Sequence, residues 1–181
     1  MFLMEISNMG AKKLKSYEEL TSRVSYLYSM LHEVRERLLN IIDDLNDEML
    51  DFTPDERIFE TIGTLLLHIV AIEWSWVFED IDGLEMDYEK FKHAFALRSD
   101  VNIPQLKGKN KQFYLDQLKE VRENVFQRLT KFSDKDLDKI VESNADKFSI
   151  EWILFHILEH EIMHIGQILL LRRLFEKQNF R

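Results

Sequence analysis

The stretch from Phe148 to Lys177 places the tightest limit on how this chain can fold. It reads FSIEWILFHILEHEIMHIGQILLLRRLFEK, and its apolar residues recur at steps of three and four, which predicts one long helix. Within it, His156, His160 and His164 follow one another at four-residue intervals and therefore share one side of that helix. Such a helix must bury an apolar face together with histidines, and this requires other helices around it.

The rest of the chain supplies those helices. A first helix is expected over residues 16–45, where apolar residues again alternate steps of four and three, and two more are expected over residues 61–83 and 111–132. Only five Gly and two Pro occur in 181 residues, so turn formers are scarce. We therefore predict an all-α protein, a four-helix bundle that forms a single domain over residues 16–181 after an irregular lead-in over residues 1–15.

The connections between these helices differ in length. Residues 46–60 and 133–147 are polar or charged, and each is predicted to be a linker. Residues 82–110 form a connection longer than a tight antiparallel turn needs, so it can cross over and leave the second and third helices parallel. Its aromatic residues suggest that it packs over one end of the bundle, where a substrate opening could lie.

Charge and composition exclude several partners and ligands. The chain has 24 basic and 33 acidic residues, a net charge of −9, which argues against a nucleic-acid groove or an anionic membrane surface. It has no cysteine, so a metal ion must be held by His, Asp, Glu or water. No signal-peptide pattern is evident, and no apolar run approaches the ~18 residues that span a bilayer. We expect a cytoplasmic protein with no membrane partner.

The histidine spacing predicts a metal site. His160 and His164 fall on the inward seam of the last helix, where a divalent cation can take a lone pair from each neutral ring. His156 lies nearer the edge of that seam. The expected third ligand is His68, within the stretch TIGTLLLHIVAIE, which is apolar on nearly every side. The alternative is that these are ordinary core histidines bonded to hydroxyl or carbonyl groups. The two remaining histidines, His32 and His93, are expected at the surface or at its boundary and not at the metal site.

Two familiar motifs overlap this helix without fitting it. The run from His160 to His164 matches the zinc-peptidase pattern H-E-x-x-H, but only 17 residues follow it and none is His. Glu161 and His164 also form the E-x-x-H of di-iron proteins, but the residue three before His68 is a leucine, so the second motif is missing. Glu161 remains a candidate general base beside the metal, as does Glu73.

The segments TIGTLLLHIVAIE and SIEWILFHILEHEIMHIGQILLLRR resemble those of the DinB/YfiT-like superfamily of metal-binding four-helix bundles, and the resemblance covers about residues 16–177. It implies an up-down-down-up bundle with His68, His160 and His164 as metal ligands. It gives His156 a flanking role and lets Gln167, expected to face the core, hydrogen-bond near the site. Ile165 stands where the family often has Arg, so any contact of that Arg is in doubt.

The resemblance also implies a function. Family members are frequently homodimers that bind one divalent ion, most often nickel or zinc, and some use a low-molecular-weight thiol such as bacillithiol, mycothiol or glutathione. We therefore expect a metal-dependent thiol S-transferase acting on a small molecule. The alternatives are a metal-dependent hydrolase, a non-catalytic metal-binding stress-response protein, and a bundle without metal. Since ligand histidines must be neutral, the ion should leave below about pH 6.

Overall fold

A computed structural model describes residues 11–97, 103–143 and 145–179 of the chain. The protein is mostly helical, as predicted. Its long helices are α1 (Ser22–Asp43), α3 (Ile62–Trp74), α5 (Lys111–Leu129) and α6 (Ile150–Asn179), and the short ones are α2 (Asp47–Asp51) and α4 (Tyr88–Phe91). A π-helix (Ser75–Ile81) continues α3, and two 3-10 helices span Lys92–Phe95 and Asp136–Asp138. The irregular lead-in was predicted over residues 1–15; residues 11–15 form neither helix nor strand, and residues 1–10 lie outside the described residues.

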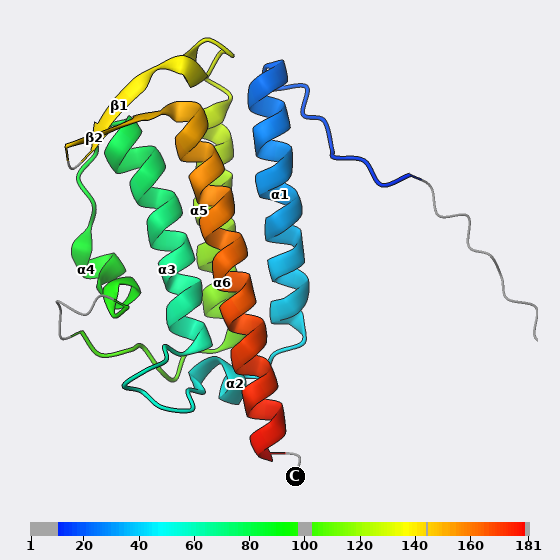
Figure 1. The fold of residues 1–181 in the computed structure, drawn as a ribbon, viewed down its shortest axis with the longest axis vertical. Coiled ribbons are helices and arrows are strands. Elements are labelled where there is room, and N and C mark those ends of the chain that lie inside the picture. Colours follow the sequence, from blue (N-terminus) through cyan, green and yellow to red (C-terminus); the bar gives the residue numbers. More distant parts are fainter. Residues whose placement is uncertain (1–10, 98–102, 144, 180–181) are drawn as a thin grey trace, which may run out of the picture.

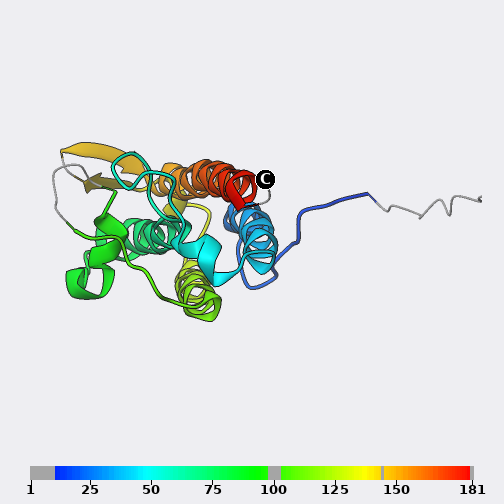
Figure 2. The ribbon, with the colours of Figure 1, turned by 90° about the horizontal axis from the view of Figure 1, so that it is seen from below.

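The four long helices lie side by side (Figure 1). Colours in Figure 1 show α1 and α6 running in one direction and α3 and α5 in the other. Along the chain, α4 and its flanking segments connect the two parallel helices α3 and α5. Seen from below, α3 and α6 are neighbours on one face, and α1 and α5 on the opposite face (Figure 2). The face formed by α3 and α6 therefore lies opposite the face formed by α1 and α5.

Side-chain caps explain where most of these helices begin. The side chains of Thr61 and Asn110 accept hydrogen bonds from backbone N–H groups three residues ahead, at the starts of α3 and α5. Ser149 Oγ does the same for Trp152 N at the start of α6. The first helix, expected from residue 16, begins only at Ser22, because residues 18–20 form a turn that precedes it.

The segment that was predicted to be a charged linker contains a small sheet. Strands β1 (Ile140–Ser143) and β2 (Asp146–Ser149) pair antiparallel, with Val141 opposite Phe148. Ala145, in the turn between them, has a φ of 73°. The expectation of a linker without secondary structure is corrected here, because the apolar residues of these four-residue strands are too few, and too diluted by charge, to stand out as a strand pattern. The sheet covers the end of the molecule where α6 begins (Figure 1).

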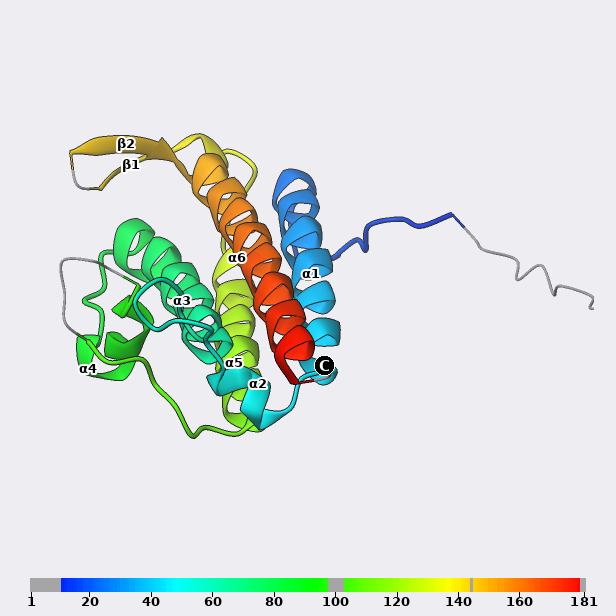
Figure 3. The same cartoon turned by 60° about the horizontal axis from the view of Figure 1, so that its bottom comes forward.

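The long connection between α3 and α5 packs along α3. Its 3-10 helix contacts α3, and α4 lies beside α3 on the side away from α6 (Figure 3). The expectation that this connection covers one end of the bundle is therefore wrong. Its aromatic residues do pack inward, since Phe91 is buried and its ring lies 5.7 Å from that of Trp74. This position brings the backbone of Ala94 next to α3.

The apolar core is divided into two halves along the helices. The upper half gathers buried residues from the start of α1, the end of α5 and the start of α6, such as Leu31, Val125 and Ile157. The lower half includes Leu38 and Leu118 and continues to the end of α6. Between these halves each long helix passes through one buried charged residue, which is described below.

Two of these helices, with lengths of 20 and 30 residues, are long and apolar enough by length and composition to cross a membrane: Ile62–Ile81 and Ile150–Asn179. Neither helix is an uninterrupted apolar run, since Glu73 and Glu161 lie within them. Both helices pack against other helices of the structure and carry buried core side chains, including Leu66 and Ile153. They serve the fold as core helices.

Gly63 marks the closest approach of α3 to α5, and its substitution should be costly. A Cβ there would lie 2.7 Å from Cζ of the fully buried Tyr114 and clash with its hydroxyl oxygen. Gly63→Ala is expected to lower the free energy of unfolding by about 1–3 kcal/mol, measured by urea denaturation. Gly166→Ala is the matched control, because a Cβ on α6 meets nothing within 4 Å, and it should raise stability by about 0.5–1 kcal/mol. Equal effects would contradict the close approach.

Candidate metal centre

Three histidines meet where α3 and α6 face each other. The ligand-competent nitrogens of His68, His160 and His164 all lie within 4.8 Å of one another. The ring of His68 lies 5.0 Å from that of His160 and 5.1 Å from that of His164, and the latter two rings are 4.4 Å apart. Two helices thus bring together the three residues that the sequence singles out. We call this group the histidine triad.

Hydrogen bonds fix which ring nitrogen of two of these histidines is free. The backbone oxygen of Ala94 lies 2.9 Å from His68 Nδ1, so Nδ1 must donate and Nε2 keeps its lone pair. His164 Nδ1 likewise lies 2.5 Å from Gln167 Oε1, while its Nε2 faces His160 Nε2 at 3.1 Å. Carbonyl acceptors behind ligand imidazoles are the usual outer partners of metal-bound histidine. The donor set therefore fits a divalent cation, with His160 Nε2 also able to hydrogen-bond His164 before an ion binds.

Burial keeps the triad neutral. It lowers the pKa of His68 to about 4, an effect reinforced by His164 and opposed by the hydrogen bond to Ala94. Burial also lowers the pKa of His160 to about 3, with further contributions from the neighbouring His164, His68 and His156. The pKa of His164 is lowered by burial as well, although the hydrogen bond that His164 donates to Gln167 opposes this shift. Neutral imidazoles are the form that binds metal, so the folded protein prepares all three ligands.

These values change the expected acid sensitivity of the site. Protons compete with an ion only near the folded-state pKa of the ligands, so zinc should be retained at pH 6 and released only below about pH 5. For the metal-free protein, histidines with lowered folded pKa contribute stability above about pH 6.5, and that stability is lost as the pH falls towards about 4. Dialysis of the zinc-loaded protein across this range, with bound zinc measured by atomic absorption, tests the prediction. Half release at pH 6 would contradict it.

His156 lies beside the triad as part of an aromatic row. Its ring is 6.2 Å from that of His160 and stacks on Trp152, with a centroid distance of 4.9 Å and an interplanar angle of 7°. Trp76 meets the His156 ring edge-on at 5.3 Å, and His156 Nδ1 lies 3.4 Å from a carboxylate oxygen of Glu159. It is thus a half-buried flanking residue, in the position that the sequence predicts.

The structure places Gln167 and Glu161 differently from what the sequence predicts. Gln167 is exposed and does not face the core, although its amide oxygen does accept the hydrogen bond from His164. Glu161 is 1% exposed, and its carboxylate is held by Arg35 and Arg122 and points into the bundle centre. A carboxylate bound in this way has no free position for a substrate proton, so the general-base role suggested for Glu161 is corrected.

The same correction applies to Glu73, the other candidate base. Its two oxygens accept hydrogen bonds from Arg35 Nη2 at 2.7 Å and from Arg122 Nε at 2.5 Å. Burial by itself would raise the pKa of Glu73, but Arg122 and Arg35 outweigh it and lower that pKa. Arg35 Nη1 also donates to the backbone oxygen of Leu118 at 2.7 Å. Both carboxylates are therefore structural partners of buried arginines.

These four residues form a neutral layer between the two halves of the core, which we call the charge layer. Arg35 comes from α1, Glu73 from α3, Arg122 from α5 and Glu161 from α6, and none is more than 5% exposed. Their two positive and two negative charges cancel, and every helix is bonded to two others through it. Since α3 and α6 also carry the triad, the charge layer fixes how these helices are rotated.

The sequence contains a signal for this layer that apolar periodicity misses. The buried row of α1 passes from Leu31 through Arg35 to Leu38, steps of four and three, whereas a purely apolar row at the same spacing would pass through Val34. Charged residues are assigned to the surface by default because lone buried charges are rare. The signal is the group of four charged residues taken together. Each long helix has one charged residue among its core positions, and the four charges sum to zero.

A cavity of about 600 Å³ lies along the C-terminal part of α3 and the π-helix that follows it. Ile72 and Trp76, one and two turns beyond His68, form one wall, and Phe95 follows the backbone that bonds His68. Glu79 and Asp80 come from the π-helix, whose wider turn displaces these side chains, as is common at functional sites. The three histidines themselves do not line it. The cavity offers aromatic and acidic contacts to a molecule that reaches the triad.

Two solved structures share the fold. A conserved protein from Enterococcus faecalis matches with a TM-score of 0.62 and 13% identity over 82% of this chain and 94% of its own. A DinB-like protein from Bacillus cereus matches with a TM-score of 0.58 and 21% identity over 80% of this chain and 89% of its own. The comparison with curated proteins gave no match.

The family is shown by sequence. The model of the DinB superfamily matches residues 30–168, which include most of α1, all of α3 and α5, and the part of α6 that carries the triad. Members of this superfamily bind metal, and the three-histidine group found here has the donors to do so. The chain belongs to the DinB superfamily.

Proposed function

We propose that this protein is a metal-dependent enzyme that transfers a small thiol to an electrophilic substrate. The observation that carries the proposal is the histidine triad, whose three nitrogens lie within 4.8 Å of one another and whose outer hydrogen bonds leave lone pairs available. His68, His160 and His164 would hold one zinc or nickel ion. When bound with an open position, such an ion lowers the pKa of a thiol or of water.

The composition of the chain limits where the thiol of this proposal can come from. The chain has no cysteine, so the sulfur nucleophile would come from a small molecule such as bacillithiol. In the transfer the sulfur forms a bond to carbon, the leaving group departs with the bonding electron pair, and the thiol proton must be accepted nearby. His156 is placed to accept it, since its ring lies 6.2 Å from that of His160 and its Nδ1 faces Glu159. The cavity bounded by Trp76 and Phe95 would hold the substrate.

An activity assay on protein purified without a histidine tag tests this proposal. The zinc- or nickel-loaded protein is incubated with monobromobimane and bacillithiol, mycothiol or glutathione, and the fluorescent thiol adduct is measured. We expect turnover above that of thiol and metal alone, lost in His160→Ala and kept in His93→Ala, because His93 bonds the Pro104 backbone oxygen away from the triad. No turnover with any thiol, together with metal-dependent ester or amide cleavage, would favour a hydrolase. Bound metal with neither activity would leave a binding protein.

The proposal takes the four long helices as an up-down-down-up bundle that works in the cytoplasm as a homodimer. An exposed apolar stripe along α6 supports dimerisation, and its members are 38–54% exposed: Trp152, Phe155, Ile162, Met163 and Leu170. These residues share one side of the helix, and Gly166 among them leaves room for a second helix.

Disruption of this stripe should dissociate the dimer. Ile162→Glu places a charge in the middle of the apolar surface and is expected to convert a dimer to a monomer in sedimentation velocity. Gln178→Glu is the control, because it adds the same charge at the far end of α6 and should leave the dimer intact. A monomeric wild-type protein would contradict this part of the proposal.

A further inference from the structure

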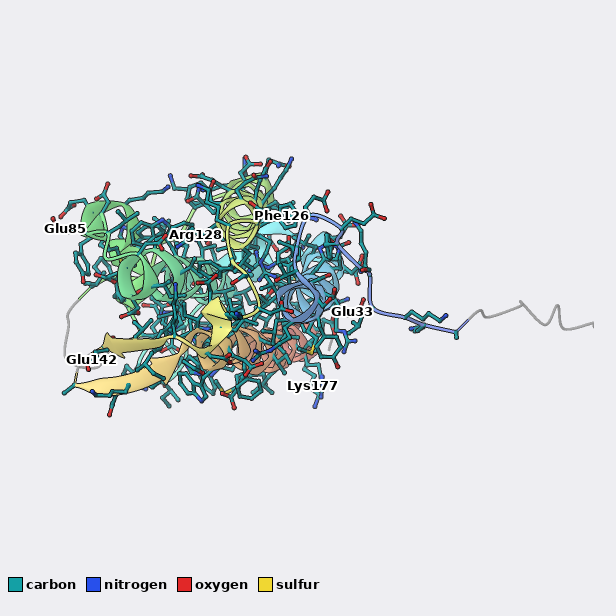
Figure 4. All side chains as sticks on the ribbon, turned by 90° about the horizontal axis from the view of Figure 1, so that it is seen from above. Glu33, Glu85, Phe126, Arg128, Glu142 and Lys177 are labelled. Carbon is teal, nitrogen blue, oxygen red and sulfur yellow. The ribbon has the colours of Figure 1, made fainter. Side chains whose placement is uncertain are left out.

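A second cavity lies on the face of the molecule opposite the triad. It is a groove of about 560 Å³ between α1 and α5, and we call it the α1–α5 groove. Its walls include Leu39 of α1 and Leu115 of α5, and Figure 4 shows Phe126 on the part of α5 next to α1. Arg35 and Arg122 of the charge layer contribute to its lining. The charge layer therefore has the triad helices on one side and this groove on the other.

One donor of the charge layer is left without an acceptor. Arg122 uses Nε and Nη2 on Glu73 and Glu161, but its buried Nη1 has no hydrogen-bond partner among the described residues. The residue is 5% exposed, so water outside the protein satisfies it poorly. A buried donor left unsatisfied costs about 1–3 kcal/mol, which an acceptor oxygen in the groove would recover.

A second polar atom without a partner belongs to Tyr17, whose ring packs against residues that line the groove. Tyr17 Oη is also buried without a hydrogen-bond partner in the described part of the chain. The Tyr17 ring packs against three residues that line the groove, at 4.8 Å from Tyr28, 5.7 Å from Phe126 and 5.8 Å from His32. Three residues that line the groove are therefore held together by contacts with the Tyr17 ring.

The charge around the groove selects the kind of molecule that fits. Its rim carries the carboxylates of Glu36, Asp116 and Glu123 against the single ammonium group of Lys119, which disfavours an anion. The charge layer below is already neutral, so an added anion would also be uncompensated. The aromatic and aliphatic walls favour a planar apolar body. A neutral molecule with an oxygen acceptor on a planar apolar body therefore suits the acidic rim, the neutral charge layer and the apolar walls.

We propose that the α1–α5 groove binds a small neutral molecule whose carbonyl or amide oxygen accepts a hydrogen bond from Arg122 Nη1 and whose planar apolar body lies against Leu115 and Phe126. This site is separate from the triad and does not rest on the proposed enzymatic function. Binding should therefore be the same in the metal-free and zinc-loaded protein.

Three probes with one ring and different head groups test the proposal: benzamide, benzoate and benzylamine. Binding is followed by NMR through the Arg122 guanidinium signals and the methyl signals of Leu39 and Leu115. Benzamide should bind with a dissociation constant on the order of 1 mM and shift the Arg122 signals, and the two charged probes should bind at least about tenfold more weakly. Preference for benzoate would show an anion site and preference for benzylamine a rim site, and either result overturns the proposal.

A filled groove provides the matched control. Leu115→Trp should abolish the benzamide shifts, whereas Asn124→Trp, at an exposed position of α5 outside the groove, should preserve them. The wild-type Arg122 signals decide the question even if Leu115→Trp folds poorly. Benzamide binding that leaves those signals unmoved, or no binding of any probe, would overturn the assignment.

Discussion

Arg35→Ala is expected to lower the free energy of unfolding by about 3–5 kcal/mol, since removing one partner of a buried ion pair leaves the remaining charges uncompensated. Arg35 donates to Glu161 at 2.7 Å, to Glu73 at 2.7 Å and to the Leu118 backbone oxygen at 2.7 Å, and all of these groups lie in the core. A loss of this size is a large share of the roughly 5–15 kcal/mol that stabilises a typical domain. Urea denaturation followed by circular dichroism measures it.

Arg23→Ala is the matched control for this effect. Arg23 also lies on α1 and also bonds two carboxylates, Asp138 and Glu151, each at 3.0 Å, but its side chain is 42% exposed. Its loss should cost much less than the loss of Arg35, because solvent screens exposed pairs. Similar losses for Arg23→Ala and Arg35→Ala would show that burial of the charge layer does not matter to stability.

Two further variants separate charge from packing. Arg35→Met keeps most of the side-chain volume but leaves a net negative charge in the layer, so it should be nearly as damaging as Arg35→Ala. Adding Glu161→Gln to Arg35→Met restores neutrality and should recover about 1–3 kcal/mol. If the second change recovers nothing, the loss comes from packing and the charge balance of the layer is unimportant.

His160→Ala is expected to weaken zinc or nickel binding by at least about 100-fold. The ion would lose one of three ligands, and protein–zinc binding on the order of 10–16 kcal/mol is shared among a few such bonds. Competition with a chromophoric chelator measures the affinity. Gln167→Ala should reduce it by about 10–100-fold, because the hydrogen bond that orients His164 is removed while all three ligands remain.

The control for this series is His93→Ala, which should leave affinity unchanged. His93 bonds the Pro104 backbone oxygen at 2.9 Å and lies outside the triad. The thermal stability of the metal-free protein should also change little in His160→Ala, since burial already disfavours a charge on that ring. Unchanged metal affinity in His160→Ala would disprove the site, whatever the activity of the wild-type protein.

Apolar periodicity was enough to predict the helical class and the placement of the long helices. Residues 148–177 and 61–83, where apolar residues recur at steps of three and four, correspond to α6 and to α3 with its π-helical extension. A long apolar face at this spacing is removed from water only when the segment is helical and packs against other helices. The spacing also identified His68, His160 and His164, which the structure brings together. The short strands β1 and β2 were not predicted, because an alternation of apolar and polar residues is hard to recognise over only four residues.

The surroundings of the triad depended on contacts between segments far apart in sequence. The acceptor for His68 is the backbone oxygen of Ala94, which no residue pattern can reveal because every residue has one. The roles of Glu161 and Glu73 depended on Arg35 and Arg122, which local reasoning assigns to the surface. Side chains one residue apart on a helix face different ways, so neighbouring His160 and Glu161 belong to separate clusters.

The sequence by itself thus determined the helical class, the family and three histidines on two helices, because helical spacing and residue type are local properties. Only the tertiary structure decided how those helices are rotated, which carboxylates are hydrogen-bonded to buried arginines, and which histidine nitrogens face one another. The physical reason is that burial and charge pairing depend on all four helices at once. The charge layer, with one residue from each long helix, shows this most directly.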